Sequence, residues 1–212
     1  MDLPASLASR AYLLAFDTSK GKLTGRGQLG VMLRAAALTE LFLDRRLTDV
    51  DGKPKATGDR VTDPLLDGIL REIAASRPRS WAYWTGRGGR ATVRAVQEQL
   101  VDRRLISVEP YRVLGIFPAR RISVRDTRLV HRLREAVTRA LRGDTPIDRL
   151  DARDAALAAL AAAGKLRVAV SRAQARERKQ WITRLEEVAG PAVPALRKVI
   201  RQRAAAAAAA GG

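Results

Sequence analysis

Residues 29–44 are the feature that most limits how this chain can fold. Their sequence, LGVMLRAAALTELFLD, carries apolar side chains at so many positions that they cover more than one face of a helix. A helix that is apolar on several sides is stable only when other elements pack around it. We therefore expect this helix to be central and buried, with the rest of the chain folded around it.

The remainder of the sequence favours helices as well. Hydrophobic residues make up 46% of the 212 residues, but only 4% are aromatic and alanine supplies much of the total. Such a mixture is typical of helical packing. We predict a mainly α, single compact helical domain over residues 1–203. Residues 204–212, seven alanines and two glycines, have little to bury, and we expect a disordered or frayed tail.

Strands are expected only in one or two short β-hairpins. Residues 45–54 carry turn signals around Asp51-Gly52 and suggest a short hairpin or an irregular excursion. Residues 105–108 and 112–117 are rich in β-branched and aromatic side chains. We place a second hairpin there, with its turn at residues 109–111.

Composition excludes several chemistries. The sequence has no cysteine and a single histidine, so thiol catalysis, disulfides, thiolate zinc sites and poly-histidine metal centres are ruled out. We find no nucleophile beside a base, and we expect no enzyme activity, no metal and no cofactor. An acidic cluster near the end of the chain has a simpler explanation as a complement to Arg149 and Arg153 within a helix; its members are Asp144, Asp148, Asp151 and Asp154.

The hydropathy of the chain and the sequence of its N-terminus indicate where in the cell the protein is located. No run reaches the roughly 18 to 20 apolar residues that a membrane-spanning helix needs, and the N-terminus lacks the pattern of a signal peptide. The expected location is cytoplasmic.

Positive charge is the strongest indication of a partner. The chain has 40 Lys and Arg against 22 Asp and Glu, a formal net charge of +18, and most of the cations are arginine. The planar guanidinium group binds phosphate or carboxylate through two parallel hydrogen bonds. A polyanionic partner is therefore expected. A codon-composition bias toward Arg and Ala is the alternative explanation. The excess is concentrated in residues 86–142 and 165–203.

Arg34 interrupts the apolar helix and needs an anionic partner, because a buried unpaired cation is costly to desolvate. One interpretation is an internal salt bridge to an acid such as Glu40. The other is that Arg34 binds the phosphate or carboxylate of a ligand.

Three further arginines recur at helical spacing, namely Arg87, Arg90 and Arg94. Spacings of three and four residues place them on one face, and Arg90 lies at the amino end of a helix, where free backbone N–H groups attract anions. This pattern predicts the rim of an anion pocket. A solvated basic face explains it equally well.

The second predicted hairpin has an apolar tip followed by arginines. The apolar residues are Val113, Leu114, Ile116 and Phe117. Apolar side chains next to cations suit the interface of an anionic membrane. The alternative is that these residues belong to a buried strand. Trp81, Trp84 and His131 we interpret as structural.

Several motifs together resemble the Golgi phosphoprotein 3 family. The segment LGVMLRAAALTELFLDRRL is similar to the family signature, in which an L-R pair within an apolar helix is followed by E-L. Other pieces agree in order, among them LLAFDTSKGKL, TGDRVTDPLLDGILREI, QLVDRRLI and DRLDARDAALAALAAAGKL. The Arg- and Ala-rich composition suggests a bacterial relative.

The resemblance implies a mostly helical protein that binds phosphatidylinositol 4-phosphate at a membrane, through a basic pocket beside an apolar hairpin. It also implies possible protein partners, since eukaryotic members bind the cytosolic tails of glycosyltransferases. The signature arginine falls on Arg34, one pocket arginine on Arg90 and a second near Arg94. The family's lipid-binding tryptophan falls on Gly25, so that contact is missing.

The hypothesis is a non-enzymatic peripheral membrane protein on the cytoplasmic face of a membrane. Arg34, Arg90 and Arg94 would bind an anionic, phosphoinositide-like headgroup, and residues 113–117 would enter the interface. The alternative is a nucleic-acid-binding protein, because residues 78–117 predict helix, loop, helix and hairpin, the order of a winged helix.

Overall fold

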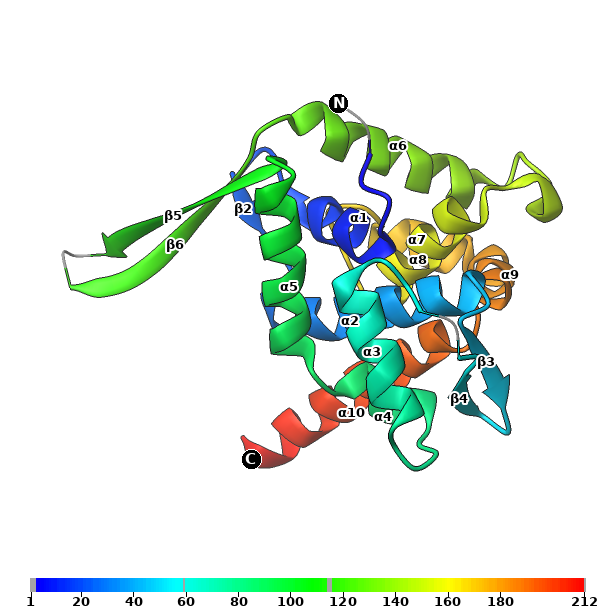
Figure 1. The fold of residues 1–212 in the computed structure, drawn as a ribbon. Helices are drawn as coiled ribbons and strands as arrows, with labels where there is room; N and C mark the ends of the chain where they lie inside the picture. Colours follow the sequence, from blue (N-terminus) through cyan, green and yellow to red (C-terminus); the bar gives the residue numbers. More distant parts are fainter. Residues whose placement is uncertain (1–2, 59, 114–115, 212) are drawn as a thin grey trace.

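A central helix, α2 (Arg26–Leu43), organises the fold of the computed structural model, which describes residues 3–58, 60–113 and 116–211. Every residue of α2 from position 31 to position 41 is buried. The helices that contact it include α1 (Leu7–Leu14), α3 (Pro64–Ala74), α5 (Gly89–Asp102), α7 (Ala152–Ala163) and α10 (Ala192–Ala210) (Figure 1). The prediction of a buried central helix is confirmed.

The other helices complete a mainly helical single domain, as predicted. They are α4 (Trp81–Gly86), α6 (Thr127–Arg142), a 3-10 turn (Ile147–Arg149), α8 (Arg172–Glu177) and α9 (Lys179–Ala189). Side chains cap several of their first turns. Asp63 accepts hydrogen bonds from the N–H groups of Leu65 and Leu66, and Asp126 accepts one from Arg128. These caps explain where α3 and α6 begin.

Three antiparallel strand pairs lie within the described residues. They are β1 (Phe16–Asp17) with β2 (Lys22–Leu23), β3 (Leu47–Val50) with β4 (Lys53–Ala56), and β5 (Ile106–Val113) with β6 (Phe117–Val124). The last two are the hairpins that the sequence predicted. The first pair is only two residues long on each side, too short to show an alternating pattern.

The turn of the β5–β6 hairpin lies elsewhere than predicted. Residues 109–111, which we expected to form the turn, lie inside β5, where Glu109 pairs with Arg121 and Pro110 with Arg120. The chain reverses beyond the pair Val113 and Phe117. Proline is tolerated in β5 because each strand of a two-stranded ribbon has a free edge. Both strands are therefore eight residues long, and the hairpin projects well beyond the helical body (Figure 1).

The C-terminal helix α10 continues through Ala210, and residues 201–211 are exposed. The proposed boundary between a domain ending at residue 203 and a frayed tail stays a prediction. Over the described ranges, none of the helices combines the length and the hydropathy that crossing a bilayer requires.

Candidate functional site

Arg34 lies where α2 faces α3 and the loop before α5. Its side chain is only 6% exposed. The Nε group donates a hydrogen bond to the carbonyl oxygen of Trp84 at 3.2 Å, and one terminal nitrogen donates to a carboxylate oxygen of Glu72 at 2.6 Å. The internal ion pair that we considered is therefore present, but its carboxylate is Glu72. Glu40 instead accepts a hydrogen bond from the N–H group of Leu7 at 2.8 Å.

Glu72 is shared between two arginines. Its second carboxylate oxygen accepts a hydrogen bond from Nε of Arg87 at 2.9 Å. Partial burial opposes ionisation of Glu72, but the hydrogen bonds from Arg34 and Arg87 outweigh it, so the pKa of Glu72 lies below its usual value. One carboxylate thus serves two guanidinium groups at neutral pH.

A cavity of about 690 Å³ opens beside this cluster, between α3 and α5. We call it the Arg34 cavity. Its charged lining residues are two cations, Arg34 and Arg87, and three carboxylates: Glu72, Glu98 and Asp102. The protein's own acids therefore more than balance the two arginines. An anion entering the cavity would have to compete with Glu72.

The position of Arg34 depends on a close approach of two helices. Gly30, one turn before Arg34 in α2, lies against Gly89 at the start of α5, and a Cβ atom built on Gly30 would come within 2.8 Å of the Gly89 carbonyl oxygen. Only glycine allows backbones this close. The preceding residue, Gly88, lies against the guanidinium group of Arg34 and lines the same cavity. Sequence reasoning missed this role of the glycines.

Arg90 and Arg94 lie on α5 but do not line the Arg34 cavity. Both side chains are exposed, and neither forms an ion pair with any residue that the structure describes. Along α5 they occupy a different flank from Ala91, Ala95 and Glu98, which face the cavity. The structure thus brings Arg87 to Arg34 and leaves Arg90 and Arg94 on the surface.

Ile116 is the one residue of the predicted membrane tip whose side chain is described, and it is 75% exposed. Val113 and Phe117 are paired through the backbone at the end of the hairpin, but their side chains lie outside the description. Leu114 lies outside the described residues altogether.

Of the three residues that we interpreted as structural, the two tryptophans are buried. Trp81 is 4% exposed and Trp84 is 2% exposed, so neither ring is free to stack on a base. His131 is exposed on α6.

The acidic cluster is divided by the fold. Asp151 caps α7, and Asp154 lies 3.6 Å from Arg10. Arg153 pairs with Asp44, the residue that caps the end of α2, at 2.9 Å. The expected pairing with an acid of its own helix is not the one observed for Arg153. Across residues 3–58, 60–113 and 116–211 there is no group of acids and histidine suited to a metal ion.

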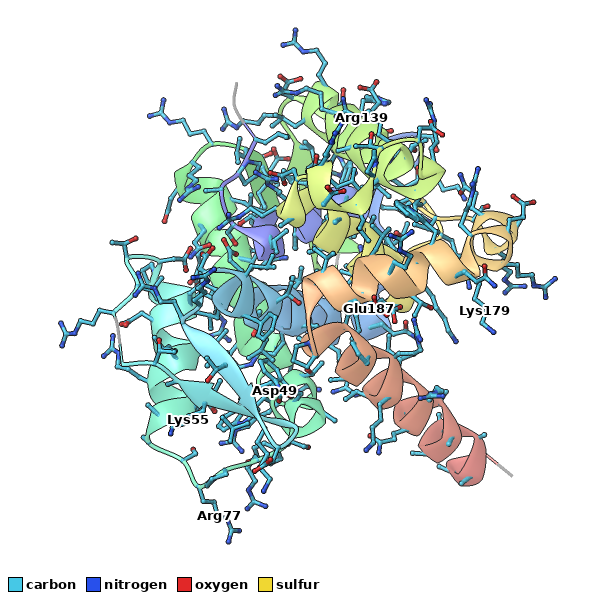
Figure 2. All side chains as sticks on the ribbon, turned by 90° about the vertical axis from the view of Figure 1, so that its right-hand side faces the viewer. Asp49, Lys55, Arg77, Arg139, Lys179 and Glu187 are labelled. Carbon is cyan, nitrogen blue, oxygen red and sulfur yellow. The ribbon has the colours of Figure 1, made fainter. Side chains whose placement is uncertain are left out.

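A second cavity, of about 500 Å³, lies under the β3–β4 hairpin and was not foreseen from the sequence. We call it the basic cavity, because four of its lining residues are cations: Lys53, Lys55, Arg77 and Arg79. Figure 2 shows Lys55 and Arg77 on the same side of the molecule, around this hairpin. The missed signal is a pair of matching triplets, Lys-Pro-Lys at 53–55 and Arg-Pro-Arg at 77–79.

Comparison with known proteins places most of the chain in one family. Residues 7–203 match the family model described as Golgi phosphoprotein 3 (GPP34). The match includes the central helix, both cavities and the β5–β6 hairpin. A search of curated proteins found no match.

Proposed function

Because the chain belongs to the Golgi phosphoprotein 3 family, we propose that it is a non-enzymatic peripheral membrane protein that binds an anionic, phosphoinositide-like headgroup. In this proposal Arg34, Arg90 and Arg94 contact the headgroup. The hairpin tip, residues 113–117, enters the interface on the cytoplasmic face of the membrane.

The observation that carries the proposal is the exposure of unpaired cations on α5. Arg90 and Arg94 are one helical turn apart and form no ion pair within the described part of the chain. A guanidinium group that no carboxylate of its own chain neutralises is available to a phosphate, which it binds through paired hydrogen bonds. Each cation near an anionic surface contributes about 1 kcal/mol.

The hairpin supports the same proposal from its position. β5 follows α5 after a short connection and packs against it, and in Figure 1 the hairpin extends outward from the end of α5. Ile116 at its tip is 75% exposed. An exposed β-branched side chain suits the boundary between headgroups and acyl chains.

In this proposal Arg34 binds the headgroup by exchanging its internal partner, Glu72, for a phosphate. Its guanidinium group is held by Glu72, so a headgroup phosphate that reaches it takes the place of that carboxylate. Arg87 shares Glu72 and is 56% exposed, which makes it the natural second ligand of the same phosphate. The Arg34 cavity thus provides a deeper site, and Arg90 and Arg94 provide the surface contact.

Vesicle flotation tests the surface contact. We expect the double variant Arg90→Ala with Arg94→Ala to bind vesicles containing phosphatidylinositol 4-phosphate about thirtyfold more weakly, since two cations are lost at roughly 1 kcal/mol each. The matched control is Arg176→Ala with Lys179→Ala, which removes two exposed cations from α8 and α9; α9 lies on the opposite side of the body from the hairpin (Figure 1). Equal binding by the two double variants would contradict the proposal.

Ile116→Asp tests the hairpin separately. Burying an isoleucine side chain is worth about 1.5 to 3 kcal/mol, so the substitution should lower vesicle binding at least tenfold. The thermal midpoint should stay unchanged, because the native side chain is exposed. Vesicle binding as strong as that of the wild type would remove the hairpin from the proposal.

Nucleic-acid binding remains the second candidate, because one observation favours it. The elements α4, α5 and the β5–β6 hairpin follow each other in the order of a winged helix. A mobility shift with duplex DNA at physiological salt, together with displacement of the protein from vesicles by that DNA, would favour this candidate over the lipid.

A further inference from the structure

The basic cavity has an apolar lining beneath a cationic rim. Its apolar residues come from three elements: Val50 and Pro54 from the hairpin, Ile73 from α3, and Trp84 from α4. Ile73, Pro54 and Trp84 are buried, whereas the lysines and Arg77 are exposed at the edge. An apolar interior with a few polar groups at its entrance is the usual form of a small-molecule site, and about 500 Å³ lies within the range of ~300 to 1,000 Å³ of such sites.

Within the described residues, no carboxylate neutralises the cations of the rim by an ion pair. Lys53, Lys55 and Arg77 form no ion pair with any residue the structure describes. Arg79 instead lies over the ring of Tyr83, with its guanidinium carbon 5.2 Å from the ring centroid. Asp51 is the sole carboxylate among the described lining residues, so four cations face one acid. This excess favours a ligand with negative charge.

The walls of the cavity are held in place by contacts outside it. The indole N–H group of Trp81 donates a hydrogen bond to Asp49 of β3 at 2.6 Å. The same ring packs edge-on against Phe42 of α2, at 6.0 Å between centroids. These contacts fasten the hairpin to the helical body. The cavity is therefore preformed and needs little rearrangement to accept a ligand.

We propose that the basic cavity binds a soluble anionic amphiphile, a carboxylate joined to a short aliphatic chain. The aliphatic chain lies against Ile73 and Trp84, and the carboxylate meets the rim formed by Lys53, Lys55 and Arg77. Charge complementarity selects the anion, and the apolar lining selects the chain. Figure 1 shows the β3–β4 hairpin on the opposite side of the body from the tip of β5–β6. A ligand for this cavity therefore arrives from solution and not from a membrane at that tip.

Titration calorimetry with decanoate, kept below its micelle concentration, tests the proposal on the full chain. We expect saturable binding of one decanoate per protein. Decanol lacks the charge and acetate lacks the chain, so both should bind at least tenfold more weakly. Equal affinity for decanoate and decanol, or for decanoate and acetate, would overturn the proposal, as would failure of decanoate to bind.

Variants assign the binding to the cavity. Lys55→Gln with Arg77→Gln should weaken decanoate about tenfold, whereas Arg90→Gln with Arg94→Gln, an equal loss of charge elsewhere, should leave it unchanged. Ala74→Trp places a ring in the cavity and should abolish binding with every charge retained. Ala75→Trp, at the neighbouring exposed position outside the lining, is its control. Unchanged affinity in Ala74→Trp, with an unchanged thermal midpoint, would show that decanoate binds elsewhere.

The assignment of a ligand to the basic cavity is independent of the proposed membrane function, and only its arrival from solution rests on that function. Positions 90 and 94 are the test of vesicle binding and the control for decanoate binding, so the two kinds of binding can succeed or fail separately. Loss of decanoate binding in the Arg90 and Arg94 variant would contradict the assignment to the basic cavity.

Discussion

The two cavities are both lined by residues of α3, yet their charges differ. In the Arg34 cavity two arginines meet three carboxylates, and Arg34 and Arg87 both hydrogen-bond to Glu72. In the basic cavity four cations meet one carboxylate. Trp84 connects the two sites, because it lines the basic cavity and its carbonyl oxygen accepts a hydrogen bond from Arg34.

Solvent access explains the difference. Arg34 is almost completely buried, and a cation removed from water must be paired within the protein. The lysines and Arg77 stay in water, where an unpaired cation costs little. Arg34, the most conspicuous arginine in the sequence, is therefore the one whose hydrogen bonds are made within the protein. The cations that are available to a ligand lie in exposed segments without a conspicuous sequence pattern.

Glu72→Gln should give the largest change in stability among the substitutions that test this comparison. It leaves Arg34 buried without an anion, which costs about 3 to 5 kcal/mol for a fully buried pair. Because Glu72 is 36% exposed, we expect a smaller decrease in the free energy of unfolding, about 2 kcal/mol, measured by urea denaturation. The double variant Arg34→Leu with Glu72→Leu should recover most of that loss. Wild-type stability in Glu72→Gln would mean that Arg34 needs no internal partner.

Gly30→Ala should have the next largest effect, because it separates the helices that carry Arg34 and Gly88. The added methyl group would clash with the carbonyl of Gly89, and we expect a loss of about 1 to 2 kcal/mol in urea denaturation. Gly27→Ala, in the first turn of the same helix, has open space around it and should be neutral or stabilising. Equal stability of the two variants would refute the close contact.

A fall in pH should weaken the ion pairs that Glu72 forms with Arg34 and Arg87, and it should not weaken the basic cavity. The pKa of Glu72 is lower in the folded protein than in the unfolded chain, so its ionised form stabilises the fold above the unfolded pKa. This contribution disappears as pH falls from about 4 through the lowered pKa. The stability difference between wild type and Glu72→Gln, followed by unfolding at each pH, should therefore shrink on acidification. A constant difference down to pH 2 would argue against ionised Glu72 as the partner.

Lys55→Gln with Arg77→Gln should change stability least. Both side chains are exposed and unpaired within the described residues, so the free energy of unfolding should stay within about 0.5 kcal/mol of the wild type. Urea denaturation beside the Glu72→Gln variant gives the contrast directly. A loss near 2 kcal/mol would mean that these cations are structural after all.

Much of the helical architecture could be predicted because its signals are local. The all-round apolar character of α2 required a central position, and capping residues such as Asp63 and Asp126 marked helix starts. The turn of β5–β6 lies elsewhere than predicted because Pro110 interrupts the β-rich pattern of the sequence, although a two-stranded ribbon accepts proline at its edge.

The sites were harder to predict because they depend on contacts between distant segments. Glu72 is 38 residues from Arg34, and nothing in the spacing of α2 points to it. The basic cavity joins residues 53–55 with 77–79, two short triplets whose four cations are offset by acids elsewhere in residues 1–85. The net charge of so long a segment does not reveal this local cluster of cations.

Glu72 also has a consequence for selectivity. It acts as a tethered competitor that already occupies the position between Arg34 and Arg87. A carboxylate from outside carries the same charge and gains nothing by displacing it, whereas a phosphate monoester carries roughly −1.5 to −2 at neutral pH. We therefore expect phosphatidylserine vesicles to leave this ion pair closed and vesicles with monoester phosphates to open it. Glu72→Gln should erase that preference in flotation.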